Sequence, residues 1–330
     1  SGYRPQDEKY QPISIEIKVG YYLADPTQGV LLAQTPNTAY LHLKNFQSNA
    51  ADSVYRRVQT FKEKADEALK YLILDLKGNT GGYTQIAADI VDFFVESNGK
   101  GPAPDILSLG PDLENADKIR VDAADPRFLG NMNIYVLTDA ATASSAEIVA
   151  DGLRQLAGAT VIGTRTWGKQ VFTRSHDLSE SMKRLKIGLK YSEGYFFIGP
   201  NQSTTGKDGL QPDIRVQTGD MRDQWDRSVL RQGDFPNALV YPEHREAPPP
   251  GEVCRLKEEH AGELDQDRRK DYAPVLQETI NGKSFVDAGI ACALAAIERR
   301  EGQTGAIVAD YVRIGPNSGP NSGMPSLSNK

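Results

Sequence analysis

Three groups of residues in the middle of the chain could together carry out acyl transfer. Ser144 and Ser145 stand at the expected start of a helix, Lys169 follows a Trp-Gly pair, and Gly81 and Gly82 lie in a turn. A serine hydroxyl can attack a carbonyl carbon when a neutral base takes its proton, and burial can lower the pKa of a lysine enough for this role. Taken singly, such a serine is more often a helix cap and such a lysine a solvated side chain.

Two buried strands must position these groups. Residues 71–76 and 134–137 are short, almost wholly apolar runs, typical of strands buried on both faces of a layered sheet. Each run leads through a turn into apolar residues at helical spacing, over 86–94 and 148–156. Repeated strand–turn–helix units predict an α/β fold, in which such turns are the usual place for a site.

The rest of the chain gives weaker signals. Residues 24–29 are rich in turn-forming types, and from about residue 217 the charge rises and the pattern weakens. The last residues repeat Gly-Pro-Asn-Ser, which predicts a flexible tail. Further strands are expected at 13–19, 39–43, 160–162 and 185–189, and further helices at 48–68, 222–231 and 287–301.

Composition excludes several classes of protein. The 330 residues include 38 Lys and Arg against 44 Asp and Glu, a net charge of −6, so neither nucleic acid nor an anionic membrane is expected as the main partner. No apolar run approaches the roughly 18 residues that span a bilayer. Cys254 and Cys292 are the only cysteines and lack zinc-ligand spacing. They could form a disulfide in an oxidising compartment or remain two buried thiols.

Four segments, in order, resemble the motifs of the carboxyl-terminal processing (tail-specific) proteases, serine peptidases with a Ser/Lys dyad. Residues 74–82 are similar to the family's D-L-R-G-N-x-G-G segment, and 209–214 to its G-I-x-P-D-I segment. Residues 142–148 and 161–169 resemble the segments that carry its nucleophile and its base. The resemblance covers about 36–216 and implies an α/β fold of the spiral ββα crotonase/Clp-protease-like type with a C-terminal extension. It implies no metal and no organic cofactor.

The family's functional residues fall on four positions. The resemblance makes Ser144 the nucleophile and Lys169 the general base, and it makes the N–H groups of Gly82 and Ser145 the oxyanion donors. The implied activity is that of a serine endopeptidase, which hydrolyses peptide bonds of protein substrates near their C-termini through an acyl-enzyme on Ser144. The expected partners are protein or peptide substrates, and the resemblance also allows an adaptor or a homo-oligomer.

The residue that orients the lysine departs from the family pattern. Many members carry glutamine four positions after the lysine, where this chain has Thr173, and others carry aspartate eleven positions after the serine, where it has Gln155. Thr173, Gln155 or the neighbouring Gln170 is therefore expected to supply the substitute hydrogen bond.

The resemblance also divides the chain into segments. Residues 1–35 form an N-terminal lead, either a remnant of the family's peptide-binding PDZ module or a substitute for it, and 36–216 form the protease core. Residues 217–313 are a C-terminal extension with helices, and 314–330 are the flexible tail. The start lacks a signal segment and an initiator Met, which is typical of a trimmed chain. The family implies an extracytoplasmic setting, periplasmic if the source is bacterial.

Two other readings compete with the peptidase. The same fold also occurs in non-catalytic ligand- or peptide-binding proteins, and the missing lysine-orienting residue leaves room for such a role. A triad of Ser144 with His176 and Asp177 is also conceivable, since histidine is the commoner base. The joint presence of Ser144, Lys169 and Gly82 favours the peptidase.

Overall fold

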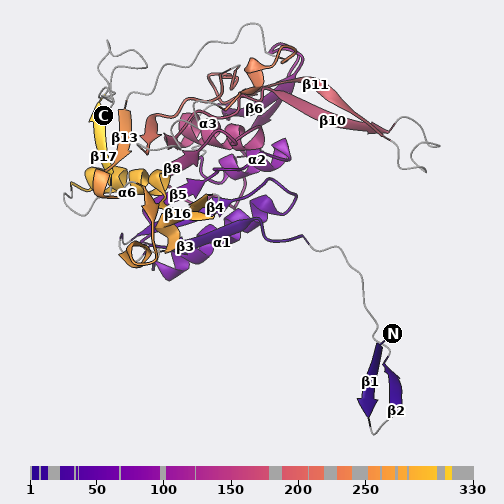
Figure 1. Ribbon diagram of the computed structural model, residues 1–330. Helices are drawn as coiled ribbons and strands as arrows, with labels where there is room; N and C mark the ends of the chain where they lie inside the picture. Colours follow the sequence, from indigo (N-terminus) through magenta and orange to yellow (C-terminus); the bar gives the residue numbers. More distant parts are fainter. Residues whose placement is uncertain are drawn as a thin grey trace.

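The structure, a computed structural model, describes residues 2–313 except 7–8, 14–22, 33–34, 36, 67, 97–101, 123, 178–187, 207, 219–228, 240–251, 261, 272–273, 281 and 303–308. It is a mixed α/β fold built on an eight-stranded sheet (Figure 1). In spatial order the strands are β17 (Ala309–Arg313), β13 (Glu252–Leu256), β12 (Ile214–Gln217), β9 (Thr160–Gly163), β8 (Asn133–Thr138), β5 (Tyr71–Asp75), β4 (Thr38–Leu43) and β3 (Thr27–Leu31). Neighbouring strands from β4 to β13 are parallel, and the outer strands β3 and β17 are antiparallel to their neighbours.

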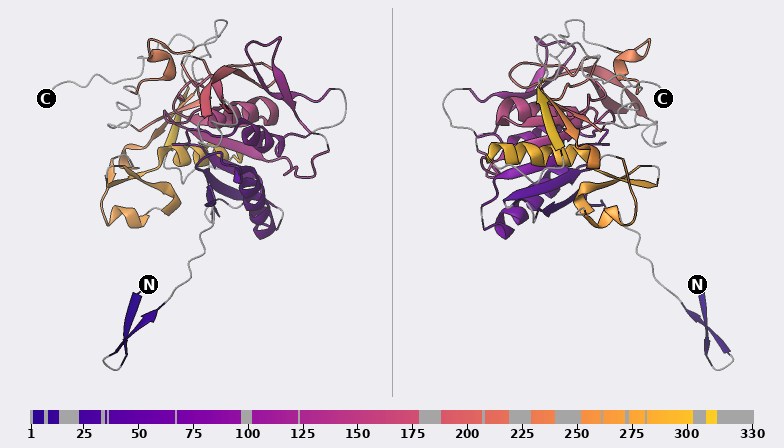
Figure 2. Two further views of the ribbon diagram at one scale, coloured as in Figure 1. Left: turned by 90° about the vertical axis from the view of Figure 1, so that its right-hand side faces the viewer. Right: turned by 60° about the vertical axis from the view of Figure 1, so that its left-hand side comes forward.

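Helices cover both faces of this sheet (Figure 2). One face packs against α1 (Ala50–Lys64), α2 (Thr84–Asp92) and α3 (Ser145–Ala157), and the other against α6 (Ala288–Arg300). Strand β5 shows how the sequence encodes this layering, because Leu72 and Leu74 enter the first core and Tyr71 and Ile73 enter the second. The predicted α/β class and the doubly buried central strand are confirmed.

A second sheet has four antiparallel strands in the order β10 (Val171–Asp177), β11 (Gly188–Ile198), β6 (Asp105–Gly110) and β7 (Asp117–Arg120). The hairpin of β10 and β11 starts just after Lys169 and extends away from the main sheet (Figure 1). Smaller sheets join β1 (Gly2–Gln6) to β2 (Lys9–Ile13), and β16 (Lys283–Val286) to β14 (Glu263–Leu264) and β15 (Gln277–Ile280). Short 3-10 helices are η1 (Gln232–Asp234), η2 (Glu258–His260), η3 (Arg268–Asp271) and η4 (Pro274–Leu276).

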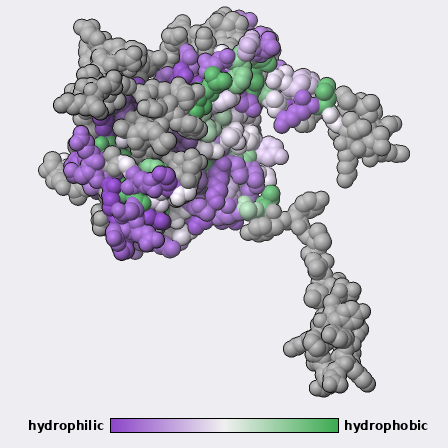
Figure 3. All heavy atoms as spheres, viewed as in Figure 1, coloured by the Kyte–Doolittle hydropathy of each residue, from purple (hydrophilic) through white to green (hydrophobic). Residues whose placement is uncertain are grey.

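The segment after residue 217 contributes directly to the main sheet. It supplies β13 and β17, and its helix α6, close to the predicted 287–301, packs on the sheet. A disulfide between Cys254 and Cys292 joins β13 to α6, which answers the question the sequence left open. On the face in Figure 3 the described surface is mainly hydrophilic, with hydrophobic side chains gathered in its upper part.

Some predicted elements have different bounds. The expected turn stretch 24–29 is only partly a turn, because residues 27–29 already belong to the edge strand β3. A Cβ on Gly29 in this strand would lie 2.5 Å from the carbonyl oxygen of Tyr40 on β4. Glycine is needed there because the strands approach so closely. The expected helix 48–68 ends at Lys64. Residues 14–19 and 185–187 of two expected strands, 222–228 of an expected helix and the tail 314–330 lie outside the described residues.

Candidate active site

The two predicted turns meet where the neighbouring parallel strands β5 and β8 end. Asn79, which has no exposed surface, joins them: its main-chain oxygen accepts the N–H of Ala143 at 3.0 Å. Its side chain accepts the N–H of Gly81 at 2.9 Å and donates to the carbonyl of Leu43 at 2.7 Å. Asn79 therefore fixes the glycine turn against the serine turn and against β4.

Ser144 has an unusual backbone conformation immediately before α3. Its φ is +59°, a region that is costly for residues other than glycine, and the residue is only 6% exposed. Gly81, at φ +98°, lies directly beside it, and a Cβ on Gly81 would be 2.7 Å from the Cβ of Ser144. A strained backbone conformation that the surrounding buried residues hold in place is common at functional sites.

The N–H groups of Gly82 and Ser145 are available for a ligand. Neither donates to another group within the described part of the chain. The Ser145 hydroxyl donates to the carbonyl of Gly82 at 3.0 Å, which holds the two residues side by side. Ser145 is the first residue of α3, where the helix dipole adds partial positive charge. Two such N–H groups can stabilise an oxyanion.

Glu147, in the first turn of α3, connects the serine to the lysine. Its carboxylate is fully buried and accepts four hydrogen bonds. Oε2 accepts the main-chain N–H of Ser144 at 2.7 Å and that of Lys169 at 3.0 Å. Oε1 accepts the N–H of Gly168 at 2.8 Å and the hydroxyl of Thr166. One side chain thus fixes the backbone at both predicted catalytic residues.

The surroundings of Lys169 lower its pKa below the ordinary value for a lysine. Burial lowers the pKa of Lys169, and the nearby charge of Lys190 lowers it further, whereas Glu147 acts in the opposite direction. Burial raises the pKa of Glu147 to about 7, against the effect of its hydrogen-bond donors. The Thr205 hydroxyl donates to the carbonyl of Lys169 at 2.9 Å and holds its main chain. Between the described side chains of Ser144 and Lys169 no hydrogen bond forms in this conformation.

This arrangement lies inside the segment that matches a known family. The sequence model of peptidase family S41 matches residues 37–216, more than half of the chain. The chain belongs to peptidase family S41. The match contains both turns, Glu147 and Lys169.

Relatives of the S41 chain are carboxyl-terminal processing proteases. It is 27% identical over 203 residues to carboxyl-terminal-processing peptidase 1 of Arabidopsis thaliana, which covers 62% of this chain and 37% of the relative. It is 25% identical over 190 residues to the carboxy-terminal processing protease CtpB of Bacillus subtilis. That alignment covers 57% of this chain and 35% of the relative. A solved structure of a photosystem II D1 C-terminal processing protease aligns with a TM-score of 0.44 and 21% identity, over 62% of this chain and 50% of that one. The chain spans just over a third of the length of these two curated relatives.

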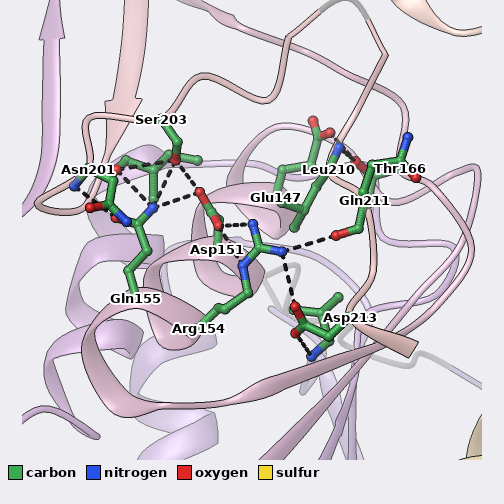
Figure 4. A network of polar contacts seen from close by, with 12 residues as sticks. Glu147, Asp151, Arg154, Gln155, Thr166, Asn201, Ser203, Leu210, Gln211 and Asp213 are labelled. Carbon is green, nitrogen blue, oxygen red and sulfur yellow. Dashed lines mark hydrogen bonds and ion pairs between the residues drawn. The ribbon is translucent and has the colours of Figure 1, made fainter. Parts of the chain in front are cut away.

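The three candidates for orienting the lysine lie in different surroundings. The amide of Gln155 bonds to Asp151, Ser203 and Asn201, so it is taken up by that network rather than directed to Lys169 (Figure 4). Thr173 is exposed on β10, next to an irregularity in the pairing with β11. Gln170 is fully buried, and its main-chain carbonyl accepts the N–H of Phe196 at 2.9 Å. The side chains of 176 and 177, the alternative base and its partner, lie outside the described residues.

Sequence reasoning did not assign a role to several residues of this S41 site. Glu147 had a readable signal, because Ser144 and Glu147 have the Ser-x-x-Glu spacing of a capping box. Asn79 matches the asparagine of the family's D-L-R-G-N-x-G-G segment, although that motif does not predict its bond to the distant Leu43. Thr166 had no such signal, since its partners come from distant segments. Over the described ranges, no cluster of three or more His, Cys, Asp or Glu side chains could hold a metal ion. In that same part of the molecule, no helix has both the length and the apolar character needed to cross a bilayer.

Proposed function

We propose that this chain is a serine endopeptidase in which Ser144 is the nucleophile and Lys169 the general base. The observation that carries the proposal is the buried carboxylate of Glu147, which accepts the main-chain N–H groups of both residues. A structural helix cap would need only the hydrogen bond within α3. The further bonds to Gly168 and Lys169 hold the segment that carries Lys169 against the turn that carries Ser144. A dyad requires that these two segments keep a fixed relative position.

The reaction follows from these positions. Ser144 Oγ attacks the carbonyl carbon of the scissile peptide bond while its proton passes to Lys169 Nζ. The N–H groups of Gly82 and Ser145 stabilise the negative charge on the carbonyl oxygen. The C–N bond breaks as Lys169 returns the proton to the leaving amine, which leaves an ester on Ser144. Water then attacks this ester while Lys169 takes a proton from the water. The bond between the carbonyl carbon and Ser144 Oγ breaks as Lys169 passes this proton to Oγ, which releases the carboxylic acid and restores the serine hydroxyl and the neutral lysine.

Lys169 must be neutral for the first step, and the burial that lowers its pKa supports this role. Hydrogen bonds between catalytic groups are often long before substrate is bound and tighten in the complex. We infer that the bond between Ser144 and Lys169 forms when a peptide excludes water from the site. Of the three candidates we propose Gln170 as the residue that orients Lys169, because it is buried and adjacent in the chain.

The proposed substrates are proteins or peptides cleaved near their C-termini. The names of the relatives, carboxyl-terminal processing proteases, support this class. An extracytoplasmic location is proposed because the Cys254–Cys292 disulfide requires an oxidising compartment in most organisms. Delivery of substrates by an adaptor, or assembly of several copies, belongs to the same proposal.

The test is cleavage of casein by the wild-type chain beside Ser144→Ala and Lys169→Ala, with Lys283→Ala as a control. Lys283 is an exposed lysine that pairs with Glu263 in the small sheet of β14, β15 and β16. Loss of cleavage in the two dyad variants, with the control active, is the expected result. A serine-directed acylating probe should label the wild type and not Ser144→Ala. A wild-type chain that neither cleaves nor takes the probe would favour the non-catalytic binding protein.

A further inference from the structure

An ion pair between a partly exposed lysine and two buried carboxylates links the glycine turn to the C-terminal helix α6. Lys77 is the second residue after β5. Its ammonium group lies 2.5 Å from Oδ2 of Asp287 and 3.6 Å from Oδ2 of Asp75. The side chains of Asp287 and Asp75 are only 9% and 5% exposed, so solvent screens these contacts weakly. Asp287 lies outside the segment that matches the S41 family model.

Asp287 uses its two oxygens for two different purposes. Oδ1 accepts the N–H of Ile290 at 3.0 Å and caps α6, while Oδ2 accepts from Lys77. The ammonium group also lies 3.6 Å from the point that a Cβ on Gly289 would occupy, over the first turn of α6. A cation at the N-terminus of a helix is disfavoured by the helix dipole. The Asp287 carboxylate compensates for this, and it keeps Lys77 in place.

The neighbouring carboxylates stabilise the protonated, charged form of Lys77. Burial alone would lower its pKa, but the carboxylates of Asp287 and Asp75 outweigh burial and hold the pKa well above its ordinary value. Asp75 is fixed in turn, because it accepts the hydroxyl of Tyr40 at 2.8 Å and the main-chain N–H of Lys77 at 2.9 Å. Both the main chain and the side chain of Lys77 are therefore held.

The turn that follows Lys77 is short and carries the oxyanion donor. The N–H of Gly78 donates to Asp139 at 3.0 Å, and Asn79 holds the N–H of Gly81. Gly82 follows directly, with φ +155° and a Cβ position only 2.4 Å from the carbonyl oxygen of Phe46. Because this backbone has little room, a shift at Lys77 would be passed to the N–H of Gly82.

We propose that Asp287 is a positioning residue for peptide hydrolysis: through Lys77 it holds the turn that presents the Gly82 N–H to the oxyanion. This rests on the proposed function. It makes the C-terminal segment, with α6 anchored by the Cys254–Cys292 disulfide, a working part of the active site.

The test compares Asp287→Asn with Arg299→Gln. Asparagine is as good a helix cap as aspartate, so Asp287→Asn removes the charge and keeps the cap. Arg299→Gln breaks an ion pair with Glu252, of 2.9 Å, at the other end of the same helix. The measurements are kcat and KM on a peptide substrate, the affinity for a peptide aldehyde, and amide hydrogen exchange in peptides covering 76–84.

Asp287→Asn should lower kcat about tenfold with KM nearly unchanged, since losing an oxyanion donor altogether costs roughly a hundredfold or more. Affinity for the aldehyde, whose adduct on Ser144 places an oxyanion in the same site, should fall by the same factor. Exchange at 78–82 should become faster. Arg299→Gln should change none of these. Lys77→Gln removes the same ion pair from its other end and should reproduce the result, which covers the case in which Asp287→Asn does not fold.

Unchanged kcat and aldehyde affinity in Asp287→Asn would overturn the proposal. Equal losses in Asp287→Asn and Arg299→Gln would also overturn it, because they would show only a general effect on α6. If the wild type neither cleaves nor takes the acylating probe, the proposed function fails, and hydrogen exchange still decides the positioning role. Faster exchange confined to 78–82 would support that role, and unchanged exchange would contradict it.

Discussion

The carboxylate of Glu147 accepts the main-chain N–H of Ser144 at 2.7 Å, three residues before it at the start of α3. This bond holds Ser144 in its positive-φ conformation beside Gly81. The same oxygen also accepts the N–H of Lys169, so the conformation of the proposed nucleophile and the position of the proposed base depend on one buried group.

Glu147→Gln should lower kcat/KM by about a hundredfold. In the wild type both carboxylate oxygens accept hydrogen bonds. Glutamine replaces one of these oxygens by an NH2 group, which cannot accept and would face the same donors. Labelling of Ser144 by the acylating probe should slow by the same factor. Glu298→Gln, a half-buried glutamate on α6, is the matched control and should stay within twofold of the wild type. Wild-type labelling in Glu147→Gln would show that its four hydrogen bonds do not matter to the site.

Titration of Glu147 should make the free energy of unfolding depend on pH. Burial raises its folded-state pKa from 4.5 to about 7, so between these values the folded state binds more protons than the unfolded state. The free energy of unfolding should therefore fall as pH rises from 4.5 to 7, by about 3 kcal/mol in total from this group. Urea unfolding of wild type and Glu147→Gln across this range measures the difference. A difference that does not vary with pH would mean that Glu147 titrates normally.

Lys190→Gln should move the rise of kcat/KM to higher pH. In the proposed mechanism Lys169 acts only when neutral, and burial and the positive charge of Lys190 both lower its pKa. Removing that charge raises the pKa of Lys169, so less of the neutral form exists at any given pH. The pH profiles of wild type and Lys190→Gln test this, with the remote Lys283→Gln as the control. A shift to lower pH, or an equal shift in the control, would contradict the assignment.

Gly81→Ala should abolish activity, because its Cβ would meet the Cβ of Ser144 at 2.7 Å and its φ is +98°. Gly158→Ala is the matched control: its φ is +67°, and a Cβ there meets nothing within 4 Å. The control should lose about 1 kcal/mol of stability from backbone strain alone and keep its activity. Casein cleavage and thermal unfolding of both variants separate the two effects. An active Gly81→Ala would mean that the turn can move away from the serine.

The sequence by itself determined the elements that rest on local patterns. The apolar runs at β5 and β8 and the helical spacing of α1, α2, α3 and α6 predicted strands and helices close to those observed. These elements bury their own apolar faces, so periodicity is enough to reveal them. The motifs around Ser144, Lys169 and Gly82 also indicated the family, because the turns that carry them are short and local.

Only the tertiary structure decided which distant residues complete the site. Edge strand β3, the arm of β10 and β11, and strands β13 and β17 depend on pairing with partners elsewhere in the chain. The pairing of Cys254 with Cys292 and of Lys77 with Asp287 joins residues 38 and 210 positions apart. Likewise the side chain of Gln155 bonds to Ser203, 48 positions away. Such contacts follow from the register of the sheet and the packing of the helices, which no local pattern specifies.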